Sequence, residues 1–387
     1  MKIHVGIVSD QILPNLIPAL MERPDLVCLA CSETMAARGI PARLARQLKQ
    51  QAIAVQIHEN APEVGLSMIL RYAFEMAEKV QEAHPDAEIV LNATGGTKLM
   101  TLGFVEAFRS IGARIIYTDT SHRRIECLPD GNSVIPEALP MRDVLKVPDY
   151  LRAQGFQAKS LKSDDHLWRE GAASRKQVCK YLGQHASKIQ DFIGALNGMA
   201  NAAIDREGNL VSPVQSLGKT PWGKWAEALG KIAAANLLRW QDGCDEVEFV
   251  NEEALQFLHG GWLEEYVWHV LKDNGAFDCK LGVKGVWEAG DNSLNEFDVI
   301  AAHCNQLLFV ECKTLKYNGE NDNEIAYKVE SLGKQARGLF GESWVVSART
   351  PTEVMHERAK QANLRVIGPE DLHHLKEIVI EWIRGND

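Results

Sequence analysis

The stretch Glu88–Lys98, EIVLNATGGTK, is the part of the chain that decides the fold of its first third. Residues 89–91 are apolar, as in a buried strand, and the residues after Lys98 have a helical pattern. Between these two segments, Gly95 and Gly96 allow the backbone to turn tightly and to approach a ligand closely. A strand, a glycine-rich turn and a helix begin a βαβ unit, in which the turn lies beyond the carboxyl end of the strand.

The same alternation of strand and helix extends over the first 130 or so residues. Strand-like runs occur at Lys2–Val8, Leu26–Ala30, Ala54–Ile57, Glu88–Leu91 and Arg114–Tyr117. Helical patterns lie between them at Leu13–Met21, Ala36–Lys49, Pro62–Ala83 and Thr97–Ser110. This order predicts a parallel sheet that is covered by helices on both faces. Arg124–Leu128 and the turn residues after it predict a hairpin appended to that sheet.

Polar residues follow three of the predicted strands. Ser9–Gln11 follows the first, Asn92–Lys98 the fourth and Thr118–Thr120 the fifth. The amides of Thr97 and Lys98 would point out of a helix N-terminus, where the helix dipole favours anions. The loop has neither the Walker spacing nor GxGxxG, so ATP hydrolysis and dinucleotide redox chemistry lose support. An ordinary capped turn would explain the loop alone, but three polar strand ends around it favour a small-ligand site.

The middle of the chain, from about residue 145, is dominated by helical patterns. These occur at Asp164–Glu170, Arg175–Leu182, Ala186–Ala203 and Trp222–Trp240. The turn residues of Ile204–Val211 give the order helix, helix, β-ribbon, which is that of a winged-helix module. Since many helical spacers share this order, DNA binding, a spacer role and dimerisation all stay open. For most tryptophans, Trp222 among them, core packing is the expectation.

Two strand-like segments in the last third, Phe297–Ile300 and Leu308–Lys313, flank the turn-like residues His303–Gln306. A two-residue loop at Cys304 and Asn305 would join the segments in a hairpin.

In that register Asp298 lies opposite Glu311 and Glu296 lies opposite Lys313, so the two carboxylates and the lysine share one face. A slip of one residue would break this geometry. A solvated face with a surface ion pair is the alternative. The apolar neighbours Leu307–Val310 argue against it, because unpaired charges on a buried strand are costly.

Clustered carboxylates repel each other unless a hard divalent cation neutralises them. Mg²⁺ or Mn²⁺ bound by Asp298 and Glu311 would polarise a phosphodiester and lower the pKa of an attacking water. The backbone carbonyl of Cys312 is a candidate for a further ligand. Lys313 is then placed to orient the water and to stabilise the transition state.

Upstream of this constellation, Gly260–Leu271 has the pattern of an amphipathic helix, with Glu264 and Glu265 near its first turn. Acidic residues are common at the start of any helix, so they indicate little by themselves.

The first-strand end Val8–Gln11 and the loop Asn92–Lys98 resemble the CARF domain, the Rossmann-like ligand sensor of CRISPR-associated proteins. The resemblance covers about the first third of the chain. It implies a domain that dimerises and binds a cyclic oligoadenylate, with tetra-adenylate as the expected ring, across a two-fold axis. The ligand-binding residues that it implies are Ser9, Asp10, Gln11, Asn92, Thr94, Gly95, Gly96, Thr97 and Lys98.

From about residue 253 to the end, the order Glu … Asp … Glu-x-Lys resembles that of the PD-(D/E)XK restriction-endonuclease-like nucleases, although phenylalanine and not proline precedes the aspartate. In that family's terms Asp298 and Glu311 would bind the metal, Lys313 would assist catalysis and Glu264 would support the metal or its water. Glu265 would replace Glu264 if the helix were rotated. The catalytic residues implied are Glu264, Asp298, Glu311, Lys313 and Gln335. Three nearby basic residues are candidates for phosphate contacts or for a solvated helix face: Lys328, Lys334 and Arg337.

Composition limits the remaining possibilities. The 387 residues include 52 acidic and 42 basic side chains, which argues against bulk-charge coating of nucleic acid but not against a local basic channel. No apolar run approaches the ~18 residues of a membrane helix. The N-terminal residues are typical of a strand and not of a signal peptide. Eight scattered cysteines fit reduced thiols, so we expect a cytoplasmic protein.

These features predict an α/β protein of three domains: a Rossmann-like CARF domain at 1–143, a helical, winged-helix-like linker at 144–252 and an α/β restriction-endonuclease-like domain at 253–387. The order resembles that of the CRISPR ancillary nucleases of the Card/Can type. It implies a homodimeric nuclease that depends on Mg²⁺ or Mn²⁺, cleaves DNA and/or RNA and is activated by cyclic oligoadenylate. Two alternatives remain: a constitutive DNA repair or structure-specific nuclease, and a ligand-responsive DNA-binding transcription regulator with an inert third domain.

Overall fold

The computed structural model describes residues 1–129, 136–288, 293–315, 328–333, 336 and 341–385. The chain divides into two compact units. Unit 1 comprises Met1–Gln157 with Cys304–Gln306, and unit 2 comprises Ala158–His303 with Leu307–Asp387. Residues 144–252, for which we predicted a separate linker, are therefore shared: 144–157 lie in unit 1 and 158–252 in unit 2.

Unit 1 is built on a seven-stranded sheet with the strand order β3-β2-β1-β4-β5-β6-β7. The first five strands are parallel, and β6 and β7 continue the sheet antiparallel. The strands are β1 (Lys2–Ile7), β2 (Leu26–Ala30), β3 (Ala54–His58), β4 (Glu88–Asn92), β5 (Arg114–Asp119), β6 (Arg124–Cys127) and β7 (Leu139–Pro140). The predicted parallel sheet is thus confirmed, and it places the ends of β1, β4 and β5 at one edge.

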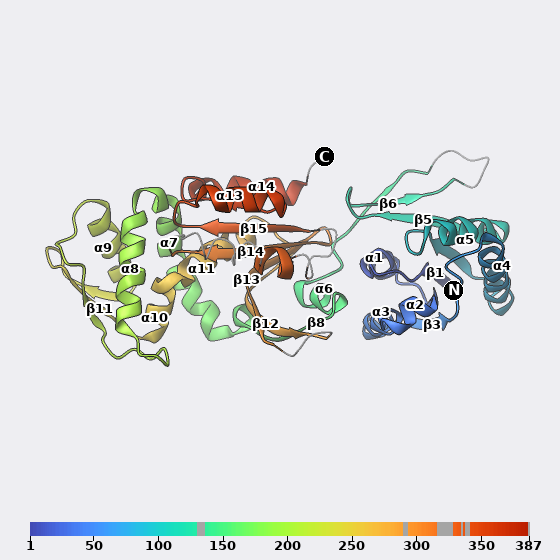
Figure 1. Ribbon diagram of the computed structural model, residues 1–387, viewed down its shortest axis with the longest axis horizontal. Helices are drawn as coiled ribbons and strands as arrows, with labels where there is room; N and C mark the ends of the chain where they lie inside the picture. The colour runs from blue at the N-terminus through green and yellow to red at the C-terminus, as the bar shows by residue number, and fades with distance from the viewer. Residues whose placement is uncertain (130–135, 289–292, 316–327, 334–335, 337–340, 386–387) are drawn as a thin grey trace. The chain divides into compact units, whose positions relative to one another are not determined.

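Two groups of helices cover this sheet: in Figure 1, α1 to α3 lie to one side of β1, and α4 and α5 lie to the other. The helices are α1 (Leu13–Glu22), α2 (Glu33–Ala37), α3 (Ile40–Gln50), α4 (Leu66–Ala83), α5 (Lys98–Ser110) and α6 (Val147–Ala153). The apolar side chains of α4 and α5 pack on β1 and β4 in one core, which includes Phe104, Phe108 and Met76.

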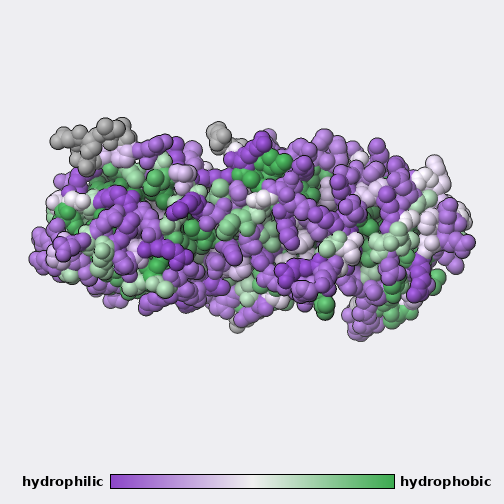
Figure 2. Space-filling model, turned by 180° about the vertical axis from the view of Figure 1, so that it is seen from behind, coloured by the Kyte–Doolittle hydropathy of each residue, from purple (hydrophilic) through white to green (hydrophobic). Residues whose placement is uncertain are grey.

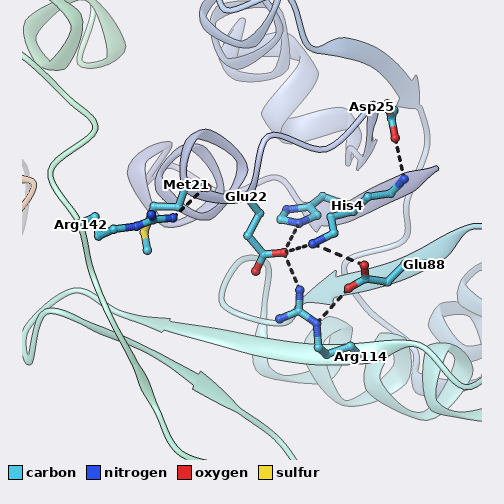
Figure 3. Close-up of polar contacts among 8 residues, drawn as sticks. His4, Met21, Glu22, Asp25, Glu88, Arg114 and Arg142 are labelled. Atoms are coloured by element: carbon cyan, nitrogen blue, oxygen red, sulfur yellow. Dashed lines mark hydrogen bonds and ion pairs between the residues drawn. The ribbon is translucent and has the colours of Figure 1, made fainter.

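An ion-pair network at the amino ends of the parallel strands ties α1 to the sheet (Figure 3). The Glu22 carboxylate contacts Lys2 Nζ at 3.0 Å, His4 Nε2 at 3.2 Å and Arg114 Nη2 at 2.5 Å. Burial alone would raise the pKa of Glu22, but the hydrogen bonds from these three partners hold it well below its usual range. Because the network lies at the edge opposite the glycine loop, we assign it a structural role.

Unit 2 contains a six-stranded sheet with the order β16-β15-β14-β13-β12-β8. Its strands are β8 (Phe156–Leu161), β12 (Asp278–Trp287), β13 (Asn295–His303), β14 (Gln306–Lys313), β15 (Glu342–Ser347) and β16 (Arg365–Ile367). β13 and β14 are joined by Cys304 and Asn305, which have φ values of 48° and 56°, as in a two-residue hairpin turn. The predicted hairpin loop is therefore confirmed.

Helices and a small second sheet complete unit 2 (Figure 1). The α-helices are α7 (His166–His185), α8 (Gln190–Ala203), α9 (Lys224–Ala234), α10 (Glu252–Gln256), α11 (Trp262–Asp273), α13 (Glu353–Gln361) and α14 (Leu375–Arg384). The shorter turns are η1 (Lys162–Asp164), η2 (Ala186–Lys188), the π-helical η3 (Phe257–Gly261) and η4 (Leu372–His374). The small antiparallel sheet has the order β10-β11-β9, with β9 (Val214–Ser216), β10 (Leu238–Trp240) and β11 (Glu246–Phe249).

One hydrophobic core runs through unit 2. It joins Trp168 and Phe192 of α7 and α8 to Trp262 of α11, Trp344 of β15 and Trp382 of α14. The helices α7, α8 and α9 therefore share their core with the sheet of the last third.

The middle of the chain differs from prediction at several elements. The expected helix Trp222–Trp240 is divided into α9 and β10, and Trp222 is 81 % exposed, so its expected core position is wrong. Ile204 and Leu210 form an isolated antiparallel bridge, and the ribbon itself is built from β9, β10 and β11. Local patterns did not distinguish these elements because each of these strands has only three or four residues.

Within the described parts of the chain, no helix is long and apolar enough to cross a membrane. The face drawn in Figure 2 is mainly hydrophilic, with small hydrophobic areas between the hydrophilic residues.

Candidate functional site

The glycine loop of unit 1 lies directly against the end of β1. A Cβ atom on Gly95 would lie 2.0 Å from the backbone oxygen of Ile7, which no side chain can tolerate. Gly96 has a φ of +80°, and its Cβ would lie 2.6 Å from Ile7 Cγ2. Both positions therefore need glycine. Gly95 lies too close to the backbone of Ile7 for a side chain, and Gly96 combines a close contact with the Ile7 side chain and a positive φ.

Two of the predicted ligand residues hold this loop in shape. Asn92 is buried, and its Nδ2 donates to the Pro14 carbonyl at 2.6 Å. The Thr94 hydroxyl donates to Asn92 Oδ1 at 2.6 Å and accepts from the Thr118 amide at 2.7 Å. The side chains of Asn92 and Thr94 are thus engaged within the protein, where they fix the backbone of the loop.

The outer part of the loop is exposed. Thr97 caps α5 by accepting from the Met100 amide at 3.2 Å, and Lys98 begins the helix with an exposed side chain. The N-terminus of α5 and the Lys98 ammonium thus present positive charge to solvent at this edge.

The end of β1 adds three polar residues at the same edge. The Ser9 hydroxyl donates to the Gln11 carbonyl at 3.3 Å, and the Asp10 carboxylate is paired with Arg38. Gln11 Oε1 is buried and accepts no hydrogen bond from the described residues. The sequence prediction missed Arg38, because it placed this residue inside one helix over Ala36–Lys49, whereas Arg38 lies at the break between α2 and α3.

The carboxylate of Glu311 is the centre of the second site, in unit 2. Its side chain is 0 % exposed, and both of its oxygens are hydrogen-bonded to lysine. Lys313 Nζ lies 2.7 Å from Oε1, and Lys328 Nζ lies 2.8 Å from Oε1 and 3.0 Å from Oε2. A surface ion pair is thereby excluded at Glu311, since the carboxylate lies wholly inside the fold.

Asp298 lies next to Glu311, as predicted. Its Oδ2 accepts a hydrogen bond from the Cys312 amide at 2.8 Å, which joins β13 to β14 at this point. Burial and the Glu311 charge raise the pKa of Asp298. Burial lowers the pKa of Lys313, but Glu311 and Asp298 outweigh that effect and raise it, so the ammonium stays charged.

Glu264 faces the same site from α11. It lines a cavity of about 890 Å³ together with Lys313, and burial followed by the Asp298 charge raises its pKa. The alternative Glu265 lies inside the core, where Arg175 Nη2 and Nε contact its two oxygens at 2.9 and 3.2 Å. The helix therefore presents Glu264 to the cavity, and Glu265 is held by Arg175.

Comparison with known proteins matches both units to described domains. Residues 3–150 match the Card1 CARF domain, and residues 251–386 match the Card1-like endonuclease domain. The chain joins a Card1-type CARF domain to a Card1-like endonuclease domain. The predicted fold class, the CARF and endonuclease identities of the two end domains and the prediction of an enzyme are thereby confirmed.

Two solved structures resemble the CARF–endonuclease chain over nearly its whole length. Protein VC1899 from Vibrio cholerae is 25 % identical, with a TM-score of 0.85, and covers 100 % of this chain and 99 % of its own. Can2 from Sulfobacillus thermosulfidooxidans, solved in complex with cyclic tetra-adenylate, is 25 % identical, with a TM-score of 0.76. The match covers 98 % of this chain and 97 % of the Can2 chain.

A type III CRISPR defence DNA nuclease activated by cyclic oligoadenylate is 19 % identical, with a TM-score of 0.55, over 91 % of this chain and 46 % of its own. At this identity the likeness shows the fold alone. A search of curated protein sequences gives no match.

The endonuclease cavity also contains residues that the sequence prediction did not single out. They come from η1, α10, η3 and β12 and include Lys162, Gln256, His259 and Lys284. Gln335, Lys334 and Arg337, which we predicted beside the active site, lie outside the described residues.

A second group of potential metal ligands in the endonuclease half, Cys179, Glu265 and His269, lies in the core. Arg175 neutralises Glu265, and His269 Nε2 contacts the Ala172 carbonyl at 3.1 Å. Burial and the Glu265 charge raise the pKa of Cys179 well above its usual value, so it remains a thiol. We interpret this group as a structural ion pair.

Proposed function

We propose that the chain is a metal-dependent endonuclease that cleaves nucleic acid when a cyclic oligoadenylate binds to its CARF domain. The observation that carries this proposal is the buried Glu311, which two lysines contact beside Asp298 in a domain of the endonuclease type. Can2 supports the choice of ligand, because that relative was solved with cyclic tetra-adenylate and matches 98 % of this chain. Cyclic tetra-adenylate is therefore the first candidate activator.

The two carboxylates beside the endonuclease cavity, next to its lining residues Cys312 and Lys313, fit a hard divalent cation. Asp298 and Glu311 would hold Mg²⁺ or Mn²⁺, with the Cys312 carbonyl as a further oxygen ligand. Both oxygens of Glu311 already contact cationic groups, and the raised pKa of Asp298 shows that negative charge at this point needs compensation. When bound, the cation supplies Lewis-acid polarisation of a phosphodiester and a more acidic water.

The side chains around the carboxylates perform the remaining tasks. Lys313 is held in its charged form by Glu311 and Asp298, so it can stabilise the extra negative charge that develops on the phosphate. Glu264 has a raised pKa and lines the cavity, so it can hold or accept a proton from water near neutral pH.

In the CARF domain, the exposed Thr97 and Lys98 at the N-terminus of α5 would face the phosphates of the ring. Gln11 Oε1 is buried without a partner among the described residues, and it could accept a hydrogen bond from a ribose hydroxyl or an adenine amino group. Asn92 and Thr94 would hold the loop backbone in place.

We propose that the protein forms a homodimer. Leu66 and Met68 of α4 and Leu99 and Leu102 of α5 are between 43 % and 63 % exposed, and Leu99 directly follows Lys98 of the proposed ligand site. Neighbouring exposed apolar residues favour burial against another protein surface. A second copy is the proposed occupant, because a ring with internal symmetry is matched by a two-fold axis. Since all eight cysteines are free, we propose a cytoplasmic location.

Metal binding is expected to stabilise the protein more at about pH 8 than at about pH 6. The pKa values of Asp298 and Glu264 are raised by folding, so the metal-free protein loses stability as the pH rises from the usual carboxyl range through those raised values. A cation binds the ionised carboxylates and reverses this loss. When the free cation is at a hundred times its Kd, binding raises the free energy of unfolding by about 2.7 kcal/mol, which corresponds to roughly 5–10 °C in Tm.

Thermal unfolding with and without Mn²⁺ at both pH values measures the effect. An equal rise in Tm at the two pH values would contradict a carboxylate site, and Glu311→Gln is the variant expected to remove the rise.

The function is tested by incubating the purified protein with Mn²⁺ and labelled single- and double-stranded DNA and RNA, with and without cyclic tetra-adenylate or hexa-adenylate. Cleavage that increases when either cyclic oligoadenylate is added supports the proposal. Equal cleavage without any ring would instead favour a constitutive nuclease. Sequence-specific DNA binding without cleavage of any substrate would favour a ligand-responsive transcription regulator.

A further inference from the structure

The endonuclease cavity is bordered by a segment that precedes α7 in the chain. β8 is an edge strand next to β12, and η1 follows it directly. The Leu281 amide donates to Ser163 Oγ at 3.0 Å, and Lys280 Nζ contacts Asp164 Oδ1 at 2.6 Å. These contacts fix η1 on β12, so the first residue of η1, Lys162, has a defined place beside the cavity.

The stem of Lys162 covers a position on β12 where a side chain is missing. The pairs Leu281–Val299 and Val283–Phe297 place Gly282 across from Asp298. Gly282 has a φ of +61°, and a Cβ on it would lie 2.8 Å from Lys162 Cβ and 3.3 Å from Lys162 Cδ. The methylene groups of Lys162 therefore occupy the space that Gly282 leaves open.

The ammonium group of Lys162 belongs to the same cavity as Glu264 and Lys313. Its charge lowers the pKa of Glu264 against the effects of burial and of Asp298. Trp168 lies below the ammonium, with its ring centroid 5.9 Å from Nζ. Lys162 thus lies in the cavity near enough to Glu264 for its charge to act on that carboxylate.

Lys162 differs from the other lysines of the cavity in its partners. Lys313 contacts Glu311 at 2.7 Å, and Lys284 contacts Glu296 at 3.2 Å. Lys162 is exposed and, among the described residues, has no carboxylate within ion-pair distance. A charged group held in place by its stem, with no carboxylate partner in the described parts of the chain, is suited to an anion that arrives from solution.

We propose that Lys162 binds a backbone phosphate of the nucleic-acid strand that enters the endonuclease cavity. The segment before α7 would thereby contribute to substrate binding, while Asp298 and Glu311 carry the chemistry. This inference depends on the endonuclease activity and is independent of activation by cyclic oligoadenylate.

Salt dependence of binding tests this role, because each phosphate neutralised by a lysine changes the slope of log K against log salt concentration by about 0.9 for duplex DNA and about 0.7 for single strands. Lys162→Gln is compared with Lys159→Gln, a matched variant at an exposed lysine of the preceding strand β8 that does not line the cavity. Both are made in the Glu311→Gln protein so that the probe is not cut. The probes are a fluorescein-labelled single-stranded DNA and the duplex of the same sequence.

Lys162→Gln is expected to weaken binding of the probe by about 5- to 20-fold. It should also reduce the salt-dependence slope by the amount that corresponds to the loss of about one phosphate contact. Lys159→Gln should leave the affinity for the probe and the salt-dependence slope unchanged. Lys162→Arg should restore the slope of the protein with Lys162. In the active protein Lys162→Gln should raise KM with little change in kcat. An unchanged slope would overturn the proposal, and so would a fall in kcat with an unchanged KM, which would mean that Lys162 only positions Glu264 or covers Gly282.

Discussion

Glu311→Gln is expected to reduce cleavage by more than about 100-fold while leaving binding of cyclic tetra-adenylate intact. The substitution keeps the size of the side chain but removes the negative charge that Lys313 and Lys328 contact and that would hold the cation. Loss of a residue that only orients a metal ligand lowers affinity or activity by about 10- to 100-fold, so loss of a ligand should exceed that range. Initial rates of cleavage at saturating Mn²⁺ and activator measure the effect.

Glu296→Gln is the control for this variant. Glu296 lines the same cavity and pairs with Lys284 at 3.2 Å, but its side chain is 50 % exposed. Its loss should change the rate by less than tenfold, because exposed ion pairs contribute little. Comparable rates for Glu311→Gln and the unchanged protein would place the active site elsewhere.

Gly95→Ala is expected to raise the concentration of cyclic tetra-adenylate needed for half-maximal activation by about 10- to 100-fold. The new Cβ would lie 2.0 Å from the Ile7 carbonyl oxygen, so either the loop or the end of β1 must move. Overpacking of this kind costs about 1–3 kcal/mol, and each 1.4 kcal/mol corresponds to a tenfold change in affinity. Titration of the activator against the cleavage rate, with direct binding of labelled ring as a second readout, measures the shift.

Gly230→Ala is the matched control, because an added Cβ at this position of α9 meets no atom within 4 Å. It should leave the titration unchanged. If Gly95→Ala also left it unchanged, the ring would bind at a place other than this loop.

The glycine loop and the Glu-x-Lys strand could be predicted because each is a local feature. Gly95 and Gly96 stand between a strand and a helix, and Glu311 and Lys313 alternate within one strand, so neighbours in sequence already determine their geometry. The turn at Cys304 and Asn305 is equally local, and it brings Asp298 close to Glu311.

The choice between Glu264 and Glu265 could not be made from the sequence. Both stand in the first turn of α11, and periodicity alone leaves the rotation of the helix open. The rotation of α11 is fixed by Arg175. Its two contacts to Glu265 hold that residue in the core, so Glu264 faces the cavity.

Lys162 could not be found from the sequence for a similar reason. It lines the cavity because β8 pairs with β12, and in the sequence these two strands are separated by the helices α7 to α11 and by the small sheet of β9 to β11. We predicted a separate helical linker at 144–252, yet Trp168 and Phe192 within it share a core with Trp344. Contacts over such separations depend on tertiary packing, which no local pattern encodes.

The central claim is that a cyclic oligoadenylate at the CARF domain controls metal-dependent cleavage in the endonuclease domain. The most direct test is the initial rate of nucleic-acid cleavage at fixed Mn²⁺ as cyclic tetra-adenylate is increased. We predict a saturable rise of at least about tenfold, shifted to higher concentration by Gly95→Ala and absent in Glu311→Gln. A rate that is the same with and without the ring, in a protein that binds the ring, would contradict the account.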